Sequence, residues 1–252
     1  MNYTDINART IDRWVDEGWE WGAACTHEEF ERARSGDVRV LLTPGKLVPG
    51  EWLGELRGKR LFGLACGGGQ QMPLFTAAGA ICTVLDYSER QLESERRVAA
   101  REGYDIEIIR ADMTRPLPFD DETFDIIFSP VSFCYVHEVK PIFRECFRIL
   151  KKGGVLLCGM DSGLSFLFGE DETTLVNTLP FDPLANPEQM AQLRESNDGV
   201  QFSHTLEEQI GGQLEAGFIL TGIYDDTNTT GPLHDHNVPC FYATRALKPA
   251  QP

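Results

Sequence analysis

A glycine-rich segment and two aspartates after it are the residues of this chain best suited to holding a ligand. The segment reads LFGLACGGGQQMP over residues 61–73 and ends at Pro73. Because proline suits the first turn of a helix, the pattern predicts a strand, a tight turn and a helix N-terminus whose backbone N–H groups face a bound group. Asp86 ends the next apolar run (AICTVLD), and Asp112 follows the one after it. Ligands of open α/β sheets bind at the carboxyl ends of the strands, where both carboxylates are expected.

The spacing of these residues narrows the choice of ligand. A P-loop requires Gly-Lys-Ser/Thr, and Gln70 and Gln71 stand in that place. A dinucleotide fingerprint requires G-x-G-x-x-G, and no third glycine follows at the required distance from Gly67–Gly69. A carboxylate at Asp86 can accept hydrogen bonds from both hydroxyls of a ribose, which suits NAD and S-adenosylmethionine alike.

The order of these motifs resembles the class I S-adenosylmethionine-dependent methyltransferases, and within them the small-molecule branch that includes the ubiquinone/menaquinone-biosynthesis type. The resemblance covers residues 58–160 well and the last two predicted strands moderately. It rests on the glycine loop, on Asp86 in VLDYSERQL, on Asp112 in RADMTRPLPFDDETFDIIF, and on the strand of RILKKGGVLLCG. S-adenosylmethionine is therefore the expected cofactor.

The resemblance also implies a role for each matching position. Gly67 and Gly69 would lie under the methionine part of the cofactor, and Asp86 would hold the ribose. Asp112 would face the adenine amino group with Met113 against the ring, while the end of the fourth strand would border the transferred methyl. The cofactor site implied in this way comprises Ala65, Cys66, Gly67, Gly68, Gly69, Asp86, Tyr87, Asp112, Met113, Ser129 and Pro130.

The glycine loop departs from the family pattern D-x-G-x-G-x-G at two positions. Gly63 stands at the acidic position and Ala65 at the first glycine. The missing carboxylate often orders the loop or the cofactor's ammonium group, so Gln70, Gln71 or an amino-terminal residue is expected to take its place.

Three residues are candidates for proton transfer, and each has a structural alternative. His137 and Tyr135 lie near the carboxyl end of the fourth predicted strand, where a general base would sit, but a solvated turn explains them equally well. His204 precedes a predicted helix and is either a base or a pre-helix residue. His234 and His236 flank an aspartate, but without a third spaced ligand they indicate a polar loop and no metal site.

Strand-like and helix-like segments alternate through most of the chain, which predicts a doubly wound α/β fold. Ser88 with Gln91 predicts a helix start, Gly103 its end, and Thr205 with Glu208 a second start. The predicted strands are 59–65, 80–86, 106–111, 124–129, 155–160, 218–224 and 241–246, and the longer helices are 88–102, 140–150 and 205–216. The resemblance implies a Rossmann-like seven-stranded sheet, mostly parallel with an antiparallel last strand.

Two segments lie outside this alternation. Residues 1–50 are predicted to form an amino-terminal helical cap on a methyltransferase domain of residues 51–252, and residues 161–202 form an irregular insert after the fifth strand. Such long irregular segments are usually functional, so both are expected to build the acceptor site. The alternative is that both segments only cover exposed sheet and helix surface.

Particular side chains of these two segments are assigned to the acceptor site. Trp19 and Trp21 would close one side, while Trp14 is expected to pack on the core. Leu164, Phe166, Leu167 and Phe168 of the insert would supply apolar groups. Deleting residues 1–21 is expected to abolish acceptor turnover and to leave cofactor affinity nearly unchanged.

Composition excludes several other classes of function. The formal net charge of −16 repels a phosphate backbone, which argues against a nucleic-acid substrate. No apolar run is long enough to span a membrane, and Met1–Thr10 lacks an apolar signal core. The seven cysteines include no Cys-x-x-Cys pair, and several lie in apolar runs, which indicates reduced, buried thiols in the cytoplasm.

These observations predict methyl transfer from S-adenosylmethionine to a small acceptor that the sequence does not name. Two alternatives remain open at this stage. One is an NAD-dependent oxidoreductase, against which the missing third glycine argues. The other is a protein that binds S-adenosylmethionine without catalysis, which the departures at Gly63 and Ala65 keep open.

Overall fold

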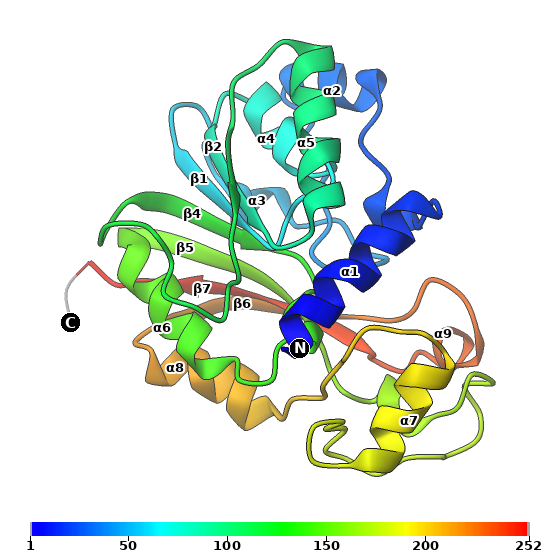
Figure 1. The fold of residues 1–252 in the computed structure, drawn as a ribbon. Helices are drawn as coiled ribbons and strands as arrows, with labels where there is room; N and C mark the ends of the chain where they lie inside the picture. Colours follow the sequence, from blue (N-terminus) through cyan, green and yellow to red (C-terminus); the bar gives the residue numbers. More distant parts are fainter. Residues whose placement is uncertain (1, 251–252) are drawn as a thin grey trace.

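A single seven-stranded sheet forms the centre of the computed structural model, which describes residues 2–250 (Figure 1). The strand order is β3-β2-β1-β4-β5-β7-β6, and β7 runs antiparallel to both of its neighbours. The strands are β1 Arg60–Leu64, β2 Ile81–Asp86, β3 Glu107–Arg110, β4 Phe124–Ser129, β5 Leu150–Asp161, β6 Ile219–Asp226 and β7 Phe241–Leu247. The predicted Rossmann-like sheet with an antiparallel last strand is confirmed.

Helices cover both faces of this sheet, with α2–α5 on one face and α6 and α8 on the other (Figure 1). Adjacent strand residues point to opposite faces, so Leu61 joins the hydrophobic core under α4 and α5 while Phe62 joins the core under α6. The helices are α1 Tyr3–Asp16, α2 His27–Arg34, α3 Gly50–Leu53, α4 Met72–Ala77, α5 Glu89–Glu102, α6 Lys140–Ile149, α7 Pro187–Glu195, α8 Gly212–Glu215 and α9 Pro232–Asp235.

The predicted helix boundaries hold for α5 and change for the helix after Thr205. The Ser88 side chain accepts a hydrogen bond from the Gln91 N–H, and Gly103 ends α5 in the left-handed conformation at φ 72°. Thr205 and Glu208 exchange the hydrogen bonds of a capping box at 3.1 and 2.8 Å. A π-helical turn, Glu207–Gly211, then precedes α8 and replaces the regular helix that the sequence predicts.

Two other elements differ from the sequence prediction. Strand β5 begins at Leu150 instead of residue 155, because Leu150 pairs with Phe124 before the register shifts and pairing resumes at Ile126 and Val155. The insert contains the helix α7, which starts where the Asn186 side chain accepts hydrogen bonds from the N–H groups of the first turn.

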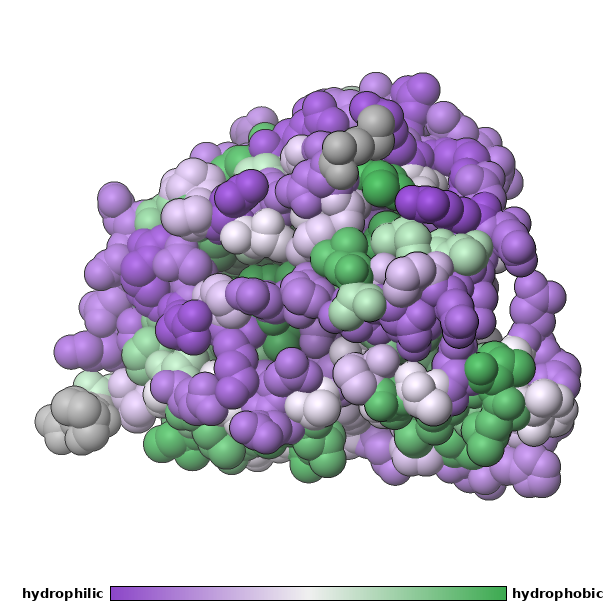
Figure 2. Space-filling model, turned by 60° about the horizontal axis from the view of Figure 1, so that its bottom comes forward, coloured by the Kyte–Doolittle hydropathy of each residue, from purple (hydrophilic) through white to green (hydrophobic). Residues whose placement is uncertain are grey.

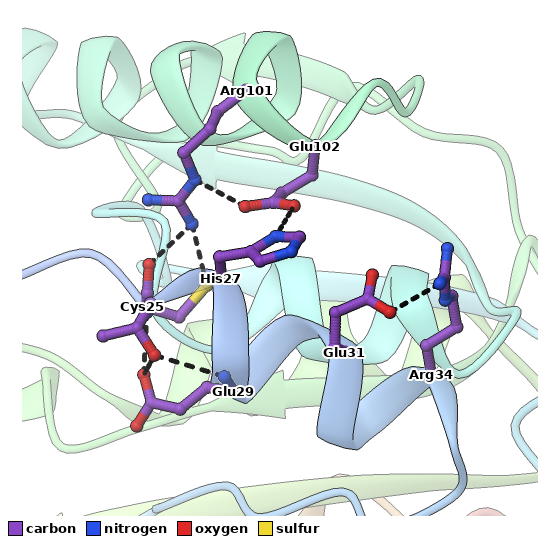
Figure 3. Close-up of polar contacts among 8 residues, drawn as sticks. Cys25, His27, Glu29, Glu31, Arg34, Arg101 and Glu102 are labelled. Atoms are coloured by element: carbon purple, nitrogen blue, oxygen red, sulfur yellow. Dashed lines mark hydrogen bonds and ion pairs between the residues drawn. The ribbon is translucent and has the colours of Figure 1, made fainter.

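The amino-terminal fifty residues divide into two parts with different surroundings. Val40, Leu42 and Val48 are buried in the core, and the Leu42 carbonyl accepts a hydrogen bond from the Val131 N–H at 3.1 Å. Figure 3 shows how the start of α2 is held by the end of α5: Arg101 donates to the Cys25 carbonyl at 2.7 Å, and Glu102 pairs with His27. The preceding helix α1 instead lies over the carboxyl edge of the sheet, where it lines a cavity.

The face shown in Figure 2 is largely hydrophilic, with hydrophobic residues scattered over it and gathered along its lower edge. Within residues 2–250, no helix combines the length and the apolar character that crossing a membrane requires. All seven cysteines are buried free thiols.

Candidate functional site

A cavity of about 140 Å³ opens at the carboxyl edge of β1, β2 and β4, where the sequence places the ligand. Eight of the predicted cofactor residues line it: Ala65, Cys66, Gly67, Asp86, Tyr87, Asp112, Met113 and Pro130. The other three do not line it. Gly68 and Gly69 lie behind Gly67 in the loop, and Ser129 is fully buried with its hydroxyl donating to the Leu64 carbonyl at 3.1 Å.

The glycine loop needs its small residues because the chain turns sharply against α5. Gly68 and Gly69 have φ angles of 93° and 70°, and a Cβ on Gly69 would lie 2.7 Å from the Val98 side chain. A Cβ on Gly67 would lie 2.8 Å from Cβ of Gln91. Ala65 adopts φ 48°, an unfavourable conformation for alanine that the surrounding strands hold in place.

Asp86 connects the loop to the start of α5. Its two carboxylate oxygens accept hydrogen bonds from the Gly67 N–H at 3.0 Å and the Ser88 N–H at 2.9 Å. Burial raises the pKa of Asp86, and these backbone hydrogen bonds oppose that rise. Because a carboxylate has about four acceptor positions, oxygens of Asp86 can still accept from two hydroxyl groups in the cavity.

A second buried carboxylate, Glu95, supports the loop from below. It accepts hydrogen bonds from the Gly69 N–H at 2.9 Å and from the Tyr104 hydroxyl at 3.2 Å, and it is fully buried. Burial raises the pKa of Glu95 to about 7. The sequence analysis did not identify this residue because ERQLESERR is highly charged, although the spacing of Glu95 from Leu92 and Val98 is that of one helix face.

Asp112 stands at the end of β3 on the opposite side of the cavity from the glycine loop. Its carboxylate accepts hydrogen bonds from the backbone N–H and the hydroxyl of Thr114 at 2.9 and 2.7 Å. These bonds fix the side chain beside Met113, which is half-buried and packs on the core under α6. Asp112 therefore presents a carboxylate to the cavity next to the apolar side chain of Met113.

Helix α1 covers this cavity with Thr4, Asn7, Ala8 and Ile11. Asn7 fastens the helix by donating to the backbone carbonyls of Tyr135 at 3.1 Å and Val200 at 2.9 Å.

Carboxylates of α1 fasten the same helix to the end of β2. Tyr87 donates its hydroxyl to Asp5 at 2.8 Å, and Ser88 donates to Asp12 at 2.6 Å. Residues far apart in the sequence thus close the cavity together.

Two buried polar atoms of the cavity wall have no hydrogen-bond partner within residues 2–250. They are Oγ1 of Thr4 and Oε1 of Gln91. Because an unsatisfied buried polar group costs free energy, these atoms indicate a polar ligand between α1 and α5. A cofactor with a ribose and an amino-acid end fits this requirement.

The structure explains why Gly63 replaces the acidic residue of the family pattern. A Cβ at position 63 would lie 2.4 Å from the sulfur of Met72, which is fully buried. Met72 therefore fills the space that an aspartate would need. Gln70 and Gln71 line the cavity close by; Gln70 donates to the Glu20 carbonyl at 3.3 Å, and Gln71 accepts from the Leu41 N–H at 3.2 Å.

A second cavity adjoins the first and has different chemistry. The two share a boundary formed by Trp19, Trp21, Gln70, Gln71, Pro130, Val131 and Tyr135. Trp14 also lines the second cavity, with its ring 5.2 Å from Trp19 and 6.4 Å from Tyr135. The expectation that Trp14 packs on the core is therefore wrong, because its half-buried ring joins this aromatic wall.

The three candidates for proton transfer lie in different places. Tyr135 belongs to the boundary between the two cavities. His137 and His204 line a separate pocket, where His137 pairs with Asp182 at 3.2 Å. His204 is buried, and its Nε2 contacts the carbonyls of Val136 at 2.8 Å and Phe133 at 3.1 Å.

Burial also lowers the pKa of His204, so this imidazole is neutral and can donate one hydrogen bond to these carbonyls.

The insert contributes other residues to the second cavity than the sequence suggests. Phe166 stacks on Phe181 with ring centroids 4.9 Å apart, and it lines a different pocket together with Phe168. Ser165, Asp198 and Gln201 line the second cavity instead. No sequence motif marks these three, since only the tertiary path of the insert brings them to the cavity.

Comparison with known proteins agrees with this geometry. The family described as Methyltransferase domain matches residues 62–158. The uncharacterized methyltransferase YbaJ of Bacillus subtilis is 37% identical over 249 residues, which cover 96% of this chain and 97% of that protein. A demethylmenaquinone methyltransferase of Clavibacter sepedonicus is 36% identical over 102 residues, 40% of this chain and 41% of that protein.

The crystal structure of an S-adenosylmethionine-dependent methyltransferase from Mesorhizobium loti has the same fold. It superposes with a TM-score of 0.63 at 20% identity and covers 78% of this chain and 94% of that one. Fold and site therefore define the class, a methyltransferase with a Rossmann-like sheet.

The chain belongs to the class I S-adenosylmethionine-dependent methyltransferase family, as its match to YbaJ over nearly the full length of both chains shows. It is an enzyme, and its cofactor is S-adenosylmethionine.

Proposed function

We propose that the first cavity binds S-adenosylmethionine and that the second holds a small-molecule acceptor. The observation that carries this proposal is the boundary of seven side chains that the two cavities share. A methyl group bound there would face the acceptor across Tyr135 and Pro130. The match to the demethylmenaquinone methyltransferase covers only 40% of this chain. We therefore do not propose demethylmenaquinone as the acceptor of this enzyme.

The cofactor roles follow from the contacts of each residue. Asp86 accepts hydrogen bonds from the ribose hydroxyls, and Asp112 and Met113 hold the adenine. Thr4 and Gln91 satisfy their free oxygens on the cofactor. Gln70 uses its side-chain N–H for the Glu20 carbonyl, which leaves its amide oxygen able to accept from the cofactor's ammonium group.

Catalysis in this site consists mainly of alignment. S-adenosylmethionine supplies a methyl group on a sulfonium, which is already a strong leaving group, so the protein positions the acceptor and excludes water. Burial first, and then the nearby carboxylates of Asp198 and Asp161, hold the pKa of Tyr135 well above its usual value. Tyr135 therefore remains a phenol at neutral pH and forms a wall of the site, while His137 and His204 act outside it.

The amino-terminal residues 1–50 act as a cap on the methyltransferase domain of residues 51–252. Within the cap, α1 closes the cofactor cavity and residues 25–48 complete the core. Seven free, buried cysteines support a cytoplasmic location, and the net charge of −16 supports a small acceptor over a nucleic acid.

A calorimetric titration with S-adenosylhomocysteine and with NAD, each on the unmodified protein, tests this function. We expect saturable binding of S-adenosylhomocysteine at one site and no saturable binding of NAD. Saturable binding of NAD alone would favour an oxidoreductase. Saturable binding of S-adenosylhomocysteine without methyl transfer to any acceptor would favour a protein that binds the cofactor without catalysis.

A further inference from the structure

The second cavity combines aromatic rings and carboxylates. Its wall contains the rings of Trp14, Trp19, Trp21, Tyr135 and Phe241. It also contains the carboxylates of Asp161 and Asp198. Among the described residues that line it, none is a lysine, an arginine or a histidine. This lining attracts a cation and repels an anion.

The carboxylates belong to different elements and face the same space. Asp161 ends β5 and is held by the Gly163 N–H at 2.6 Å and the Ser165 hydroxyl at 3.3 Å. Asp198 follows α7 in the insert and is half-buried. The nearby Arg13 guanidinium contacts the Asn197 carbonyl and pairs with Glu17, and it does not line the cavity.

The aromatic rings meet these carboxylates at the boundary with the cofactor cavity. Trp14, Trp19 and Tyr135 form a contiguous cluster, with centroid separations of 5.2 and 6.4 Å. Aromatic faces attract ammonium groups, and carboxylates beside them add charge complementarity. An alcohol would gain neither contribution, and a carboxylate or phosphate ester would be repelled by Asp161 and Asp198.

We propose that the acceptor is an amine, recognised as its ammonium ion by the Trp14–Trp19–Tyr135 cluster together with Asp161 and Asp198, and methylated on nitrogen. This inference rests on the proposed function of the two cavities. It names the substrate class that the second cavity takes.

The reaction then balances without a further reactant. The ammonium gives one proton to the Asp161 carboxylate, from which it passes to solvent, and the nitrogen keeps the electron pair. That pair forms the bond to the methyl carbon while the carbon–sulfur bond breaks, and its electrons stay on sulfur as a thioether. The products are the N-methylammonium ion, S-adenosylhomocysteine and a proton. Burial raises the pKa of Asp161 to about 6, which suits a group that takes up and releases a proton.

The test uses three probes of nearly equal shape: benzylamine, benzyl alcohol and benzoate. Each is titrated calorimetrically into the full-length protein saturated with S-adenosylhomocysteine, and N-methylbenzylamine is sought by mass spectrometry with S-adenosylmethionine present. We expect benzylamine to bind at least about tenfold more tightly than benzyl alcohol, with benzoate weakest.

Three variants assign the preference to the cavity. D161N keeps an oxygen for the Gly163 N–H, and D198N removes a charge from the insert. Each is expected to reduce the preference for the amine about threefold or more. D105N removes the same charge from an exposed position before β3, at the other end of the sheet, and should leave the preference unchanged.

Different results separate failure of the proposed function from failure of the amine proposal. If S-adenosylhomocysteine itself does not bind, the proposed function fails. If S-adenosylhomocysteine binds, the proposed function stands, and three results would then overturn the amine proposal. The first is benzyl alcohol binding as tightly as benzylamine, and the second is benzylamine showing no saturable binding. The third is D161N and D198N preferring benzylamine over benzyl alcohol as strongly as D105N does.

Discussion

Replacing Asp86 by asparagine separates cofactor binding from folding. The asparagine keeps one oxygen for either the Gly67 or the Ser88 N–H, and it loses the charge and the acceptor positions that face the cavity. Burial raises the pKa of Asp86, which means that its charge costs folding free energy at neutral pH. Loss of that charge therefore partly offsets the lost backbone hydrogen bond, and we expect only a small change in Tm.

The effect of Asp86→Asn on cofactor affinity is expected to be much larger. A hydrogen bond to a charged group contributes about 1.5–3 kcal/mol, so losing one to the ribose should raise the Kd of S-adenosylhomocysteine about 10–150-fold. Isothermal titration calorimetry measures the Kd, and differential scanning calorimetry of the same samples measures Tm. Asp105→Asn is the charge-matched control. If Asp86→Asn binds S-adenosylhomocysteine as tightly as this control, Asp86 does not hold the ribose.

Three further perturbations test other parts of the site. Deleting residues 1–21 removes α1 and its cavity-lining side chains, so the affinity for S-adenosylhomocysteine should fall at least about tenfold. The sequence alone suggests little change in this affinity. An unchanged calorimetric Kd would contradict the covering role of α1. Tyr135→Phe should retain more than about a tenth of kcat, because losing a general base would cost about 10²–10⁴-fold; a loss of that size would make the phenol a proton carrier. The pKa of Glu95 is about 7 in the folded protein, above its value in the unfolded chain. Protonated Glu95 therefore adds to the free energy of unfolding fully below the unfolded pKa, and this contribution is lost as the pH rises through 7. Denaturant titrations should therefore show that the unfolding free energy of Glu95→Gln, measured relative to that of the parent, is about 3 kcal/mol higher at pH 8 than at pH 4. If this difference between variant and parent does not change with pH, burial does not raise the pKa of Glu95.

The sequence predicts those parts of the molecule that local chemistry determines. The Ser88 cap, the Gly103 end and the positions of Asp86 and Asp112 at strand ends all follow from short-range patterns, and the structure has them as predicted. The start of α7 carries the same kind of signal, because Asn186 followed by proline is a helix N-terminus, although the surrounding prolines favour an irregular segment.

The remaining features depend on contacts between distant residues. Glu95 meets the Gly69 N–H across 26 residues, and Asn7 meets Val200 across 193. Glu95 lies three residues after Leu92 and three before Val98, so helical spacing places it on the buried face of α5. No local pattern indicates that it meets the Gly69 N–H or that α1 lies over the cofactor cavity. The same reason explains why Trp14 faces a cavity while its helical spacing suggests core packing.

A crystal structure of the protein with S-adenosylhomocysteine would show whether the first cavity is the cofactor site. We expect the ribose hydroxyls within hydrogen-bond distance of Asp86, the adenine beside Asp112 and Met113, and the sulfur at the boundary formed by Trp19 and Tyr135. We also expect the oxygens of Thr4 and Gln91 to gain partners. S-adenosylhomocysteine bound away from this cavity, or bound there with Asp86 still contacting only backbone N–H groups, would show that this cavity does not bind the cofactor as proposed.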